Sequence, residues 1–141
     1  MALKATLKIE GKSYDVRDMD YDITKPVDNN NKPSATAKGG LINFTILSPM
    51  DGNLVFHEWV TKIAETKSGE FILPLTHGIK HTTKSIKFEL AHCIRLQEYY
   101  SSSTATSQMY LRISIACAII KFSDKVEFRN NEIQQMAFDK H

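Results

Sequence analysis

The histidines and cysteines are the side chains of this sequence that could bind a metal ion. His77 and His81 are four residues apart, but Gly78 lies between them in a turn-like stretch, which disfavours their presentation on one helical face. His92 and Cys93 are neighbours in an alternating pattern, so in a strand they point to opposite faces. The sequence has neither a C-x-x-C pair nor an H-E-x-x-H motif. We therefore predict no metal site and no cofactor.

Catalysis by a cysteine requires an accessible thiolate beside a base. Cys93 and Cys117 both lie inside apolar strand patterns, which indicates buried free thiols of the kind found in a reducing cytoplasm. Lys38, Gly39 and Gly40 precede a strand instead of opening a helix, and they lack the spacing of a phosphate-binding loop. We predict that the protein is not an enzyme and has no catalytic residues.

Charge and aromatic residues bear on a nucleic-acid-binding function. The 18 basic and 16 acidic residues give a net charge of +2 and are interspersed, whereas nucleic-acid-binding proteins usually gather their basic residues on one face. Tyr99 and Tyr100 with Arg95 could stack bases in a small barrel, although aromatic residues at a strand end usually pack at the rim. A monomeric ligand- or nucleic-acid-binding β-barrel is the alternative function.

Length and hydropathy set further bounds. The chain of 141 residues fits one domain, spanning residues 1–141, and no repeat is present. The longest apolar run, Ile115 to Ile120, is far shorter than the roughly 20 residues that span a bilayer, so no membrane insertion is expected. The first residues contain no apolar segment of a secretory signal peptide, which predicts a protein that assembles in the cytoplasm.

Alternation of apolar and polar residues dominates the sequence and predicts strands. In the second strand, the apolar residues occupy even-numbered positions at Tyr14 and Val16 but odd-numbered positions at Met19 and Tyr21. This change of phase predicts one extra residue, a β-bulge, near Arg17. Further strands are predicted at residues 3–9, 41–47, 70–75, 86–96, 109–119 and 126–128. The predicted fold is mainly β, a small β-barrel of two packed antiparallel sheets with one flanking α-helix. Because residues 115–120 are apolar on both faces, we expect that strand to be covered on both sides, by the helix or by another chain.

One helix is predicted, at about residues 53–65. Phe56, Trp59, Val60 and Ile63 fall at i, i+3, i+4 and i+7 and form one apolar stripe, which we expect to pack against the barrel. Asp51 or Asn53 would cap its first turn.

A polar loop at residues 25–39 is the segment that a single compact domain does not explain. It is long, rich in turn-forming residues and without periodicity, and such loops are usually functional or disordered. A pair of glycines then allows the backbone to enter the next strand closely.

Several short runs, in this order along the chain, are similar to one protein family. They are Ser13 to Val16, Met19 to Ile23, Lys38 to Gly40, Leu54 to Val60, and Phe88 to Ile94. Together they resemble the Hcp (TssD) tube proteins of Bacteroidetes type VI secretion systems, and the resemblance covers nearly the whole chain.

This resemblance implies a structural function. Subunits of the family assemble into six-membered rings, and the rings stack into a hollow tube that a contracting sheath drives out of the cell. The implied partners are other copies of the chain, the sheath, spike and baseplate proteins, and effector proteins carried in the lumen. The resemblance also implies that the type VI machine exports the protein and that the loop at residues 25–39 reaches a neighbouring subunit. The residues predicted to make this subunit contact are Asp28, Asn29, Asn30, Asn31, Lys32, Pro33, Gly39 and Gly40.

Overall fold

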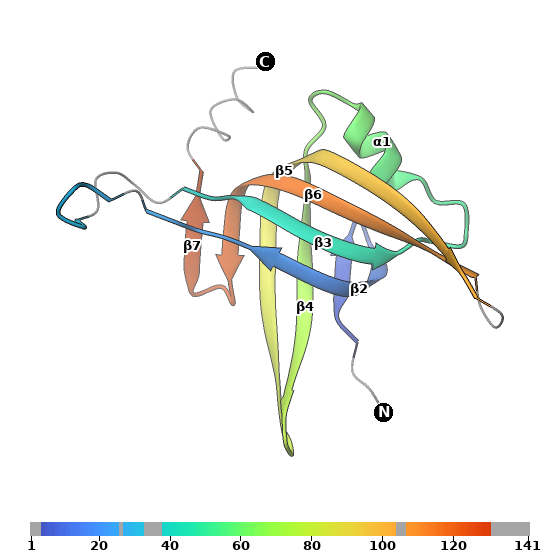
Figure 1. Cartoon of the computed structure of the whole chain (residues 1–141), viewed down its shortest axis with the longest axis horizontal. Coiled ribbons are helices and arrows are strands. Elements are labelled where there is room, and N and C mark those ends of the chain that lie inside the picture. Colours follow the sequence, from blue (N-terminus) through green and yellow to red (C-terminus); the bar gives the residue numbers. More distant parts are fainter. Residues whose placement is uncertain (1–3, 26, 33–37, 104–106, 131–141) are drawn as a thin grey trace.

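The computed structural model describes residues 4–25, 27–32, 38–103 and 107–130 (Figure 1). Within these ranges the chain is mainly β with one short helix, which confirms the predicted class. The elements in chain order are β1 (Thr6–Ile9), β2 (Lys12–Tyr21), β3 (Leu41–Leu47), α1 (Val55–Thr61), β4 (Lys67–His77), β5 (Lys80–Ser102), β6 (Ser107–Phe122) and β7 (Val126–Arg129).

All the strand pairs of the described residues are antiparallel, in the order β3-β2-β1-β4-β5-β6-β7. The long strand β6 pairs with β5 along one edge. Along its other edge, residues 110–116 pair with β3 and residues 119–122 pair with β7. The pairing of β3 with β6 closes the circuit from β3 through β2, β1, β4 and β5 back to β6. The two layers of the predicted barrel are therefore parts of one continuous sheet.

The predicted bulge in β2 is present. The register between β2 and β3 shifts between Val16 and Asp18, because one extra residue lies in β2 at this point. Beyond the shift, Met19 and Tyr21 are partly buried against the core. The extra residue thus keeps the apolar side chains of β2 facing inward while the strand bends.

Strand β5 departs from the uninterrupted alternation predicted for residues 86–96. Phe88 and Ala91 are both buried although they are three residues apart, because Leu90 between them has a positive φ of 53°. A second register shift follows Cys93, and Ile94 is 56% exposed. Each irregularity moves the following side chains to the other face of the sheet. The predicted alternation, which placed Ile86, Phe88, Leu90, His92, Ile94 and Leu96 on one face, was therefore wrong.

A chain of aromatic rings runs through the core. The ring of Phe56 in α1 lies 5.1 Å from Tyr14 in β2 and 6.4 Å from Phe44 in β3. Phe44 contacts Phe71 of β4 at 5.2 Å, and Phe71 contacts Phe88 of β5 at 5.7 Å. Edge-to-face contacts of this kind add to the stability that burial alone provides. Four strands and the helix are thereby packed against one another.

The helix is shorter than predicted, and its apolar stripe loses one member. Phe56 and Trp59 are 1% and 0% exposed, and Val60 is partly buried against the core. Ile63 is 88% exposed, so its predicted contact with the core was wrong. The helix ends before this residue, and a position seven residues along it therefore no longer lies on the same face.

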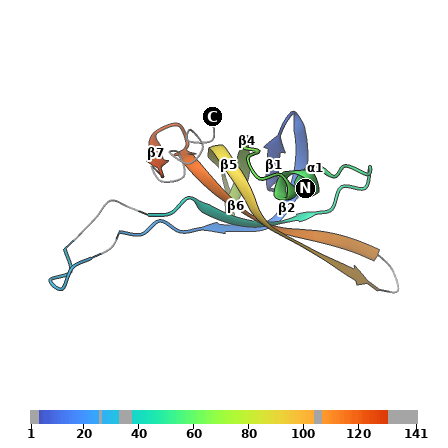
Figure 2. The same ribbon diagram turned by 90° about the horizontal axis from the view of Figure 1, so that it is seen from above.

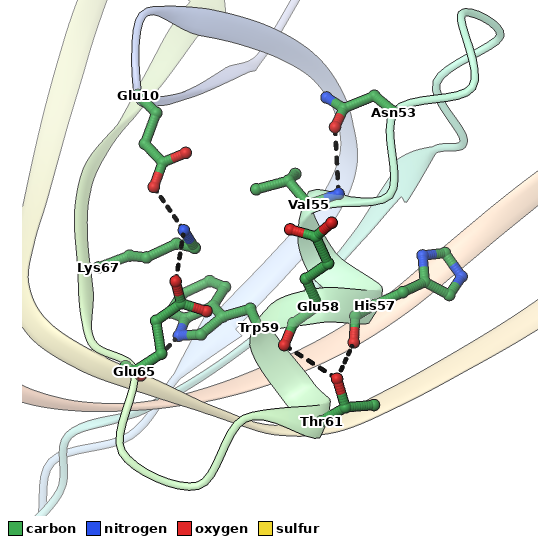
Figure 3. Close-up of polar contacts among 9 residues, drawn as sticks. All are labelled: Glu10, Asn53, Val55, His57, Glu58, Trp59, Thr61, Glu65 and Lys67. Atoms are coloured by element: carbon green, nitrogen blue, oxygen red, sulfur yellow. Dashed lines mark hydrogen bonds and ion pairs between the residues drawn. The ribbon is translucent and has the colours of Figure 1, made fainter.

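Polar contacts explain both ends of α1 (Figure 3). At its start, Leu54 and not Asp51 or Asn53 occupies the N-cap position, and it has no side-chain cap; the side-chain oxygen of Asn53, one residue earlier, accepts a hydrogen bond of 3.1 Å from the amide of Val55. At its end, the hydroxyl of Thr61 contacts the carbonyl oxygens of His57 at 2.9 Å and Glu58 at 3.0 Å. Because the hydroxyl of Thr61 donates to these carbonyl oxygens, they do not depend on backbone amides from a further helical turn. The next residue, Lys62, adopts an extended conformation, and the helix ends.

Lys67 connects three segments beside the helix (Figure 3). Its ammonium forms ion pairs with Glu10 in the β1–β2 turn and with Glu65, the latter at 3.6 Å. The backbone oxygen of Glu65 accepts a hydrogen bond of 3.1 Å from the indole nitrogen of Trp59. Burial lowers the pKa of the Lys67 ammonium, but Glu10 and Glu65 raise it more, so its pKa lies above the ordinary value of 10.5.

Replacing Lys67 by methionine should lower the free energy of unfolding at neutral pH, because it removes both ion pairs. The loss should be only about 1–2 kcal/mol, since Glu10 is exposed and water screens part of the attraction. Since the folded-state pKa is raised, the ion pairs stabilise the fold fully below pH 10.5, and their contribution falls as the pH rises through the folded-state value. Urea unfolding at several pH values measures both effects. Lys87→Met, at an exposed pair with Asp124, is the control and should change stability by less than about 0.5 kcal/mol.

The two cysteine thiols are buried, as predicted from the strand pattern. Burial raises the pKa of Cys93 to about 11, although a hydrogen bond to the carbonyl of Arg95 acts in the opposite direction. Burial alone raises the pKa of Cys117. Neither thiol should react with an aromatic disulfide reagent at pH 8 in the folded protein, and both should react in denaturant. Rapid labelling of either cysteine without denaturant would contradict this prediction.

Candidate assembly surfaces

The described part of the polar loop predicted from the sequence projects from the sheet as an arm, defined here as residues 24, 25, 27–32 and 38. At its base, the backbones of Thr24 and Lys38 exchange hydrogen bonds of 2.8 and 2.6 Å. Between these residues the chain leaves the sheet after β2 and returns before β3. Figures 1 and 2 show the described tip, residues 27–32, far from the rest of the subunit. The arm thus reaches into space that the subunit itself does not fill.

The tip of the arm is a turn held by its own hydrogen bonds. One carboxylate oxygen of Asp28 accepts hydrogen bonds from the amides of Asn30, at 2.8 Å, and Lys32, at 3.0 Å. The amide of Asn31 donates to the carbonyl of Asp28 at 3.0 Å, and Asn31 has a φ of 62°, which asparagine tolerates. Val27 beside this turn is 58% exposed. The tip therefore has a defined shape without support from the core.

The two glycines of the predicted contact lie at the base of the arm instead of its tip. A Cβ atom on Gly40 would lie 2.6 Å from the carbonyl oxygen of Cys117, and Gly40 has a φ of 96°. The side chain of Asn130 donates a hydrogen bond of 2.9 Å to the carbonyl of Gly39. Gly39 and Gly40 thus fix the arm against β6, while Asp28 to Lys32 form its end. Pro33 lies outside the described residues.

A second candidate surface contains exposed apolar side chains at the other end of the subunit. Met50 is 98% exposed, and Tyr100 and Met109 are 61% and 36% exposed. With Leu47 and Pro49 they line a hollow of about 530 Å³, which we call the methionine patch. Methionine side chains adapt to irregular partners, and exposed apolar clusters commonly mark protein interfaces. No feature of the sequence singled out this patch, because its residues come from three separate segments.

The strand expected to be covered on both faces is covered within the chain. Cys117, Ala118, Ile119 and Ile120 are consecutive and all buried, which confirms the expected burial. Ile120 faces the buried Phe128 across the pairing of β6 with β7. This stretch of β6 therefore offers no free surface to a neighbouring subunit.

The chemistry considered in the sequence analysis can be located in the structure. No group of three or more potential metal ligands occurs within the described ranges. His77 and His81 lie on the two strands of the β4–β5 hairpin. His57, which the sequence did not single out, forms a hydrogen bond with the carboxylate of Glu98 in β5. Tyr99, considered for base stacking, instead stacks on Tyr110 at 5.2 Å.

Among the residues described, no helix is long and apolar enough to cross a membrane.

Comparison with known families identifies the chain. The model of the family described as hemolysin coregulated protein Hcp (TssD) matches residues 1–131. The chain belongs to the Hcp (TssD) family. It is a tube protein of the type VI secretion system, as the resemblance in its sequence implied. No individually curated protein matches this Hcp chain in sequence.

Solved Hcp structures share the fold. Hcp1 from Flavobacterium johnsoniae is 24% identical, with 91% of this chain and 100% of that chain covered and a TM-score of 0.74. A crystal structure of an Hcp protein is 14% identical, with coverages of 92% and 99% and a TM-score of 0.69. Hcp1 from E. coli EAEC 042 is 16% identical, with coverages of 92% and 98% and a TM-score of 0.65. The Hcp fold thus extends over almost all of this chain.

Proposed function

We propose that this Hcp protein assembles into six-membered rings, that the rings stack into a hollow tube, and that the tube carries effector proteins out of the cell when a sheath contracts around it. The protein acts mechanically in this proposal and catalyses no reaction. Its partners are other copies of itself, the sheath, spike and baseplate proteins, and the cargo. Subunits assemble in the cytoplasm, and the type VI machine exports them.

The arm is the observation that carries this proposal. A closed ring needs two different surfaces on each subunit, because each contact joins unlike patches. The arm extends from one end of the layer that contains β2 and β3, and the β5–β6 hairpin extends from the opposite end (Figures 1 and 2). The methionine patch lies beside this hairpin. Two unlike projections at opposite ends support head-to-tail association of subunits.

Native mass tests the proposal directly. The purified protein should have a mass near six times that of its 16.0 kDa chain when measured by native mass spectrometry or light scattering. Electron microscopy of the same sample should show rings. A stable monomer at tens of micromolar would contradict the proposal and would favour the monomeric binding barrel.

A further inference from the structure

The hairpin formed by β4 and β5 extends beyond the rest of the sheet. Strand β1 pairs with β4 only as far as Ile72, and β6 pairs with β5 only from Ile86 onward. Among the described residues, 73–77 and 80–84 therefore pair only with one another. We call residues 73–84 the basic hairpin, and it projects from one side of the subunit (Figure 1). A two-stranded hairpin alone is only marginally stable in water, so a partner that covers it would stabilise it.

One face of the basic hairpin continues the core face of the sheet. Leu73 packs against the core, and Leu75, two residues further along the strand, lies on the same face but is 48% exposed. Ile79, in the turn between β4 and β5, is 95% exposed. The face that is buried at Leu73 thus runs on into solvent towards the tip. Apolar side chains that extend a buried face beyond the subunit indicate a contact with another protein.

The charges of the basic hairpin are all positive. Residues 71–88 contain no aspartate or glutamate. Lys87, near its base, pairs with Asp124. Lys80 and Lys84 are exposed and form no ion pair with the described residues. A surface that fits this hairpin is therefore acidic as well as partly apolar.

The opposite side of the subunit carries such a surface. Figure 1 shows α1 on the side away from the basic hairpin. Leu54, at the start of α1, is 57% exposed, and Glu58, one turn further on, is exposed without an ion pair to the described residues. Asp51 is also exposed, and residues 39–61 contain no lysine or arginine; Lys62 follows the end of the helix. We call Asp51, Leu54 and Glu58 the acidic helix surface.

We propose that the basic hairpin of one subunit docks on the acidic helix surface of a second copy of the chain. Lys80 and Lys84 face the carboxylates of that surface, and the exposed leucines of the two surfaces pack together. Within one subunit the two surfaces lie on opposite sides, so only another copy can join them, in a head-to-tail contact between unlike patches. The direction from the basic hairpin to α1 crosses the direction from the arm to the β5–β6 hairpin (Figure 1), so this contact is separate from that of the arm. It rests on the proposed self-assembly and adds a second interface to it.

Cross-linking tests this contact directly. Unlabelled and isotope-labelled full-length protein are mixed under dissociating conditions, reassembled and treated with a water-soluble carbodiimide, which joins a carboxylate to a lysine amine where the two touch. Mass spectrometry should find peptides with Asp51 or Glu58 joined to peptides with Lys80 or Lys84, the two labels being combined in one product. Rings without this product would overturn the contact and leave the proposed function standing. A protein that stays monomeric would overturn both.

Exchanged charges test the same contact by its strength. Lys80→Glu should raise the protein concentration needed for half-maximal light scattering by about tenfold, because like charges then face each other. Glu58→Lys should have the same effect, and the variant with both substitutions should assemble nearly like the parent. Lys125→Glu reverses the charge of an exposed lysine in the β6–β7 turn, outside both surfaces, and is the matched control that should assemble like the parent. Equal assembly of all these variants, or no recovery in the double variant, would refute the contact.

Discussion

Replacing Trp59 by alanine should lower the free energy of unfolding by about 3–5 kcal/mol. The side chain is 0% exposed, its ring lies 6.3 Å from that of Phe56, and its indole nitrogen donates a hydrogen bond to the backbone of Glu65. The substitution leaves a large cavity between the helix and the sheet and also removes that hydrogen bond. Urea unfolding followed by circular dichroism measures the change.

Ile63→Ala is the matched control for the Trp59 variant. Both residues were assigned to one apolar stripe from the sequence, but Ile63 is 88% exposed. Its replacement should change stability by no more than about 0.5 kcal/mol. If the two variants lost equal stability, the description of the helix as ending at Thr61 would be wrong.

Shortening the arm should abolish assembly without unfolding the subunit. When residues 28–33 are replaced by a Gly-Ser link, the tip that reaches beyond the subunit is lost, whereas the exchange of hydrogen bonds between Thr24 and Lys38 at the base remains. Since the tip makes its hydrogen bonds internally, the melting temperature should change little. Native mass spectrometry should then show mainly single subunits in place of rings.

A graded variant separates the reach of the arm from its shape. Asp28→Ala removes the carboxylate that accepts hydrogen bonds from Asn30 and Lys32 but keeps the length of the arm. Its assembly should be weaker than that of the parent and stronger than that of the shortened protein. Normal rings and tubes from the shortened protein would show that the arm is not a subunit contact.

Strands with one clean apolar face could be predicted from the sequence, and irregular backbone could not. Leu41–Leu47 was predicted with its bounds because Ile42, Phe44 and Ile46 alternate with the polar residues Asn43 and Thr45. The bulge in β2 was visible because the apolar positions themselves change phase. In β5, however, leucine and isoleucine continue the old phase through Leu90 and Ile94, so nothing in the sequence marks the positive φ or the register shift.

The candidate surfaces differ in the same way. The turn at the tip of the arm follows from local residue types, since aspartate and asparagine form such turns from their own side chains. The methionine patch combines residues as distant in sequence as Leu47 and Met109. Their proximity depends on the pairing of β3 with β6, which periodicity alone does not specify.

The closure of the sheet by β6 has a consequence for biosynthesis. Strand β3 pairs with residues 110–116, which are synthesised about seventy residues after it. Until they leave the ribosome, one edge of β3 has exposed amide and carbonyl groups that could pair with another nascent chain. Loop-closure entropy also opposes such distant pairing, so it belongs to the late part of folding. The same strand provides partners for β5 and β7, so the sheet can close only after β6, Ser107–Phe122, has left the ribosome.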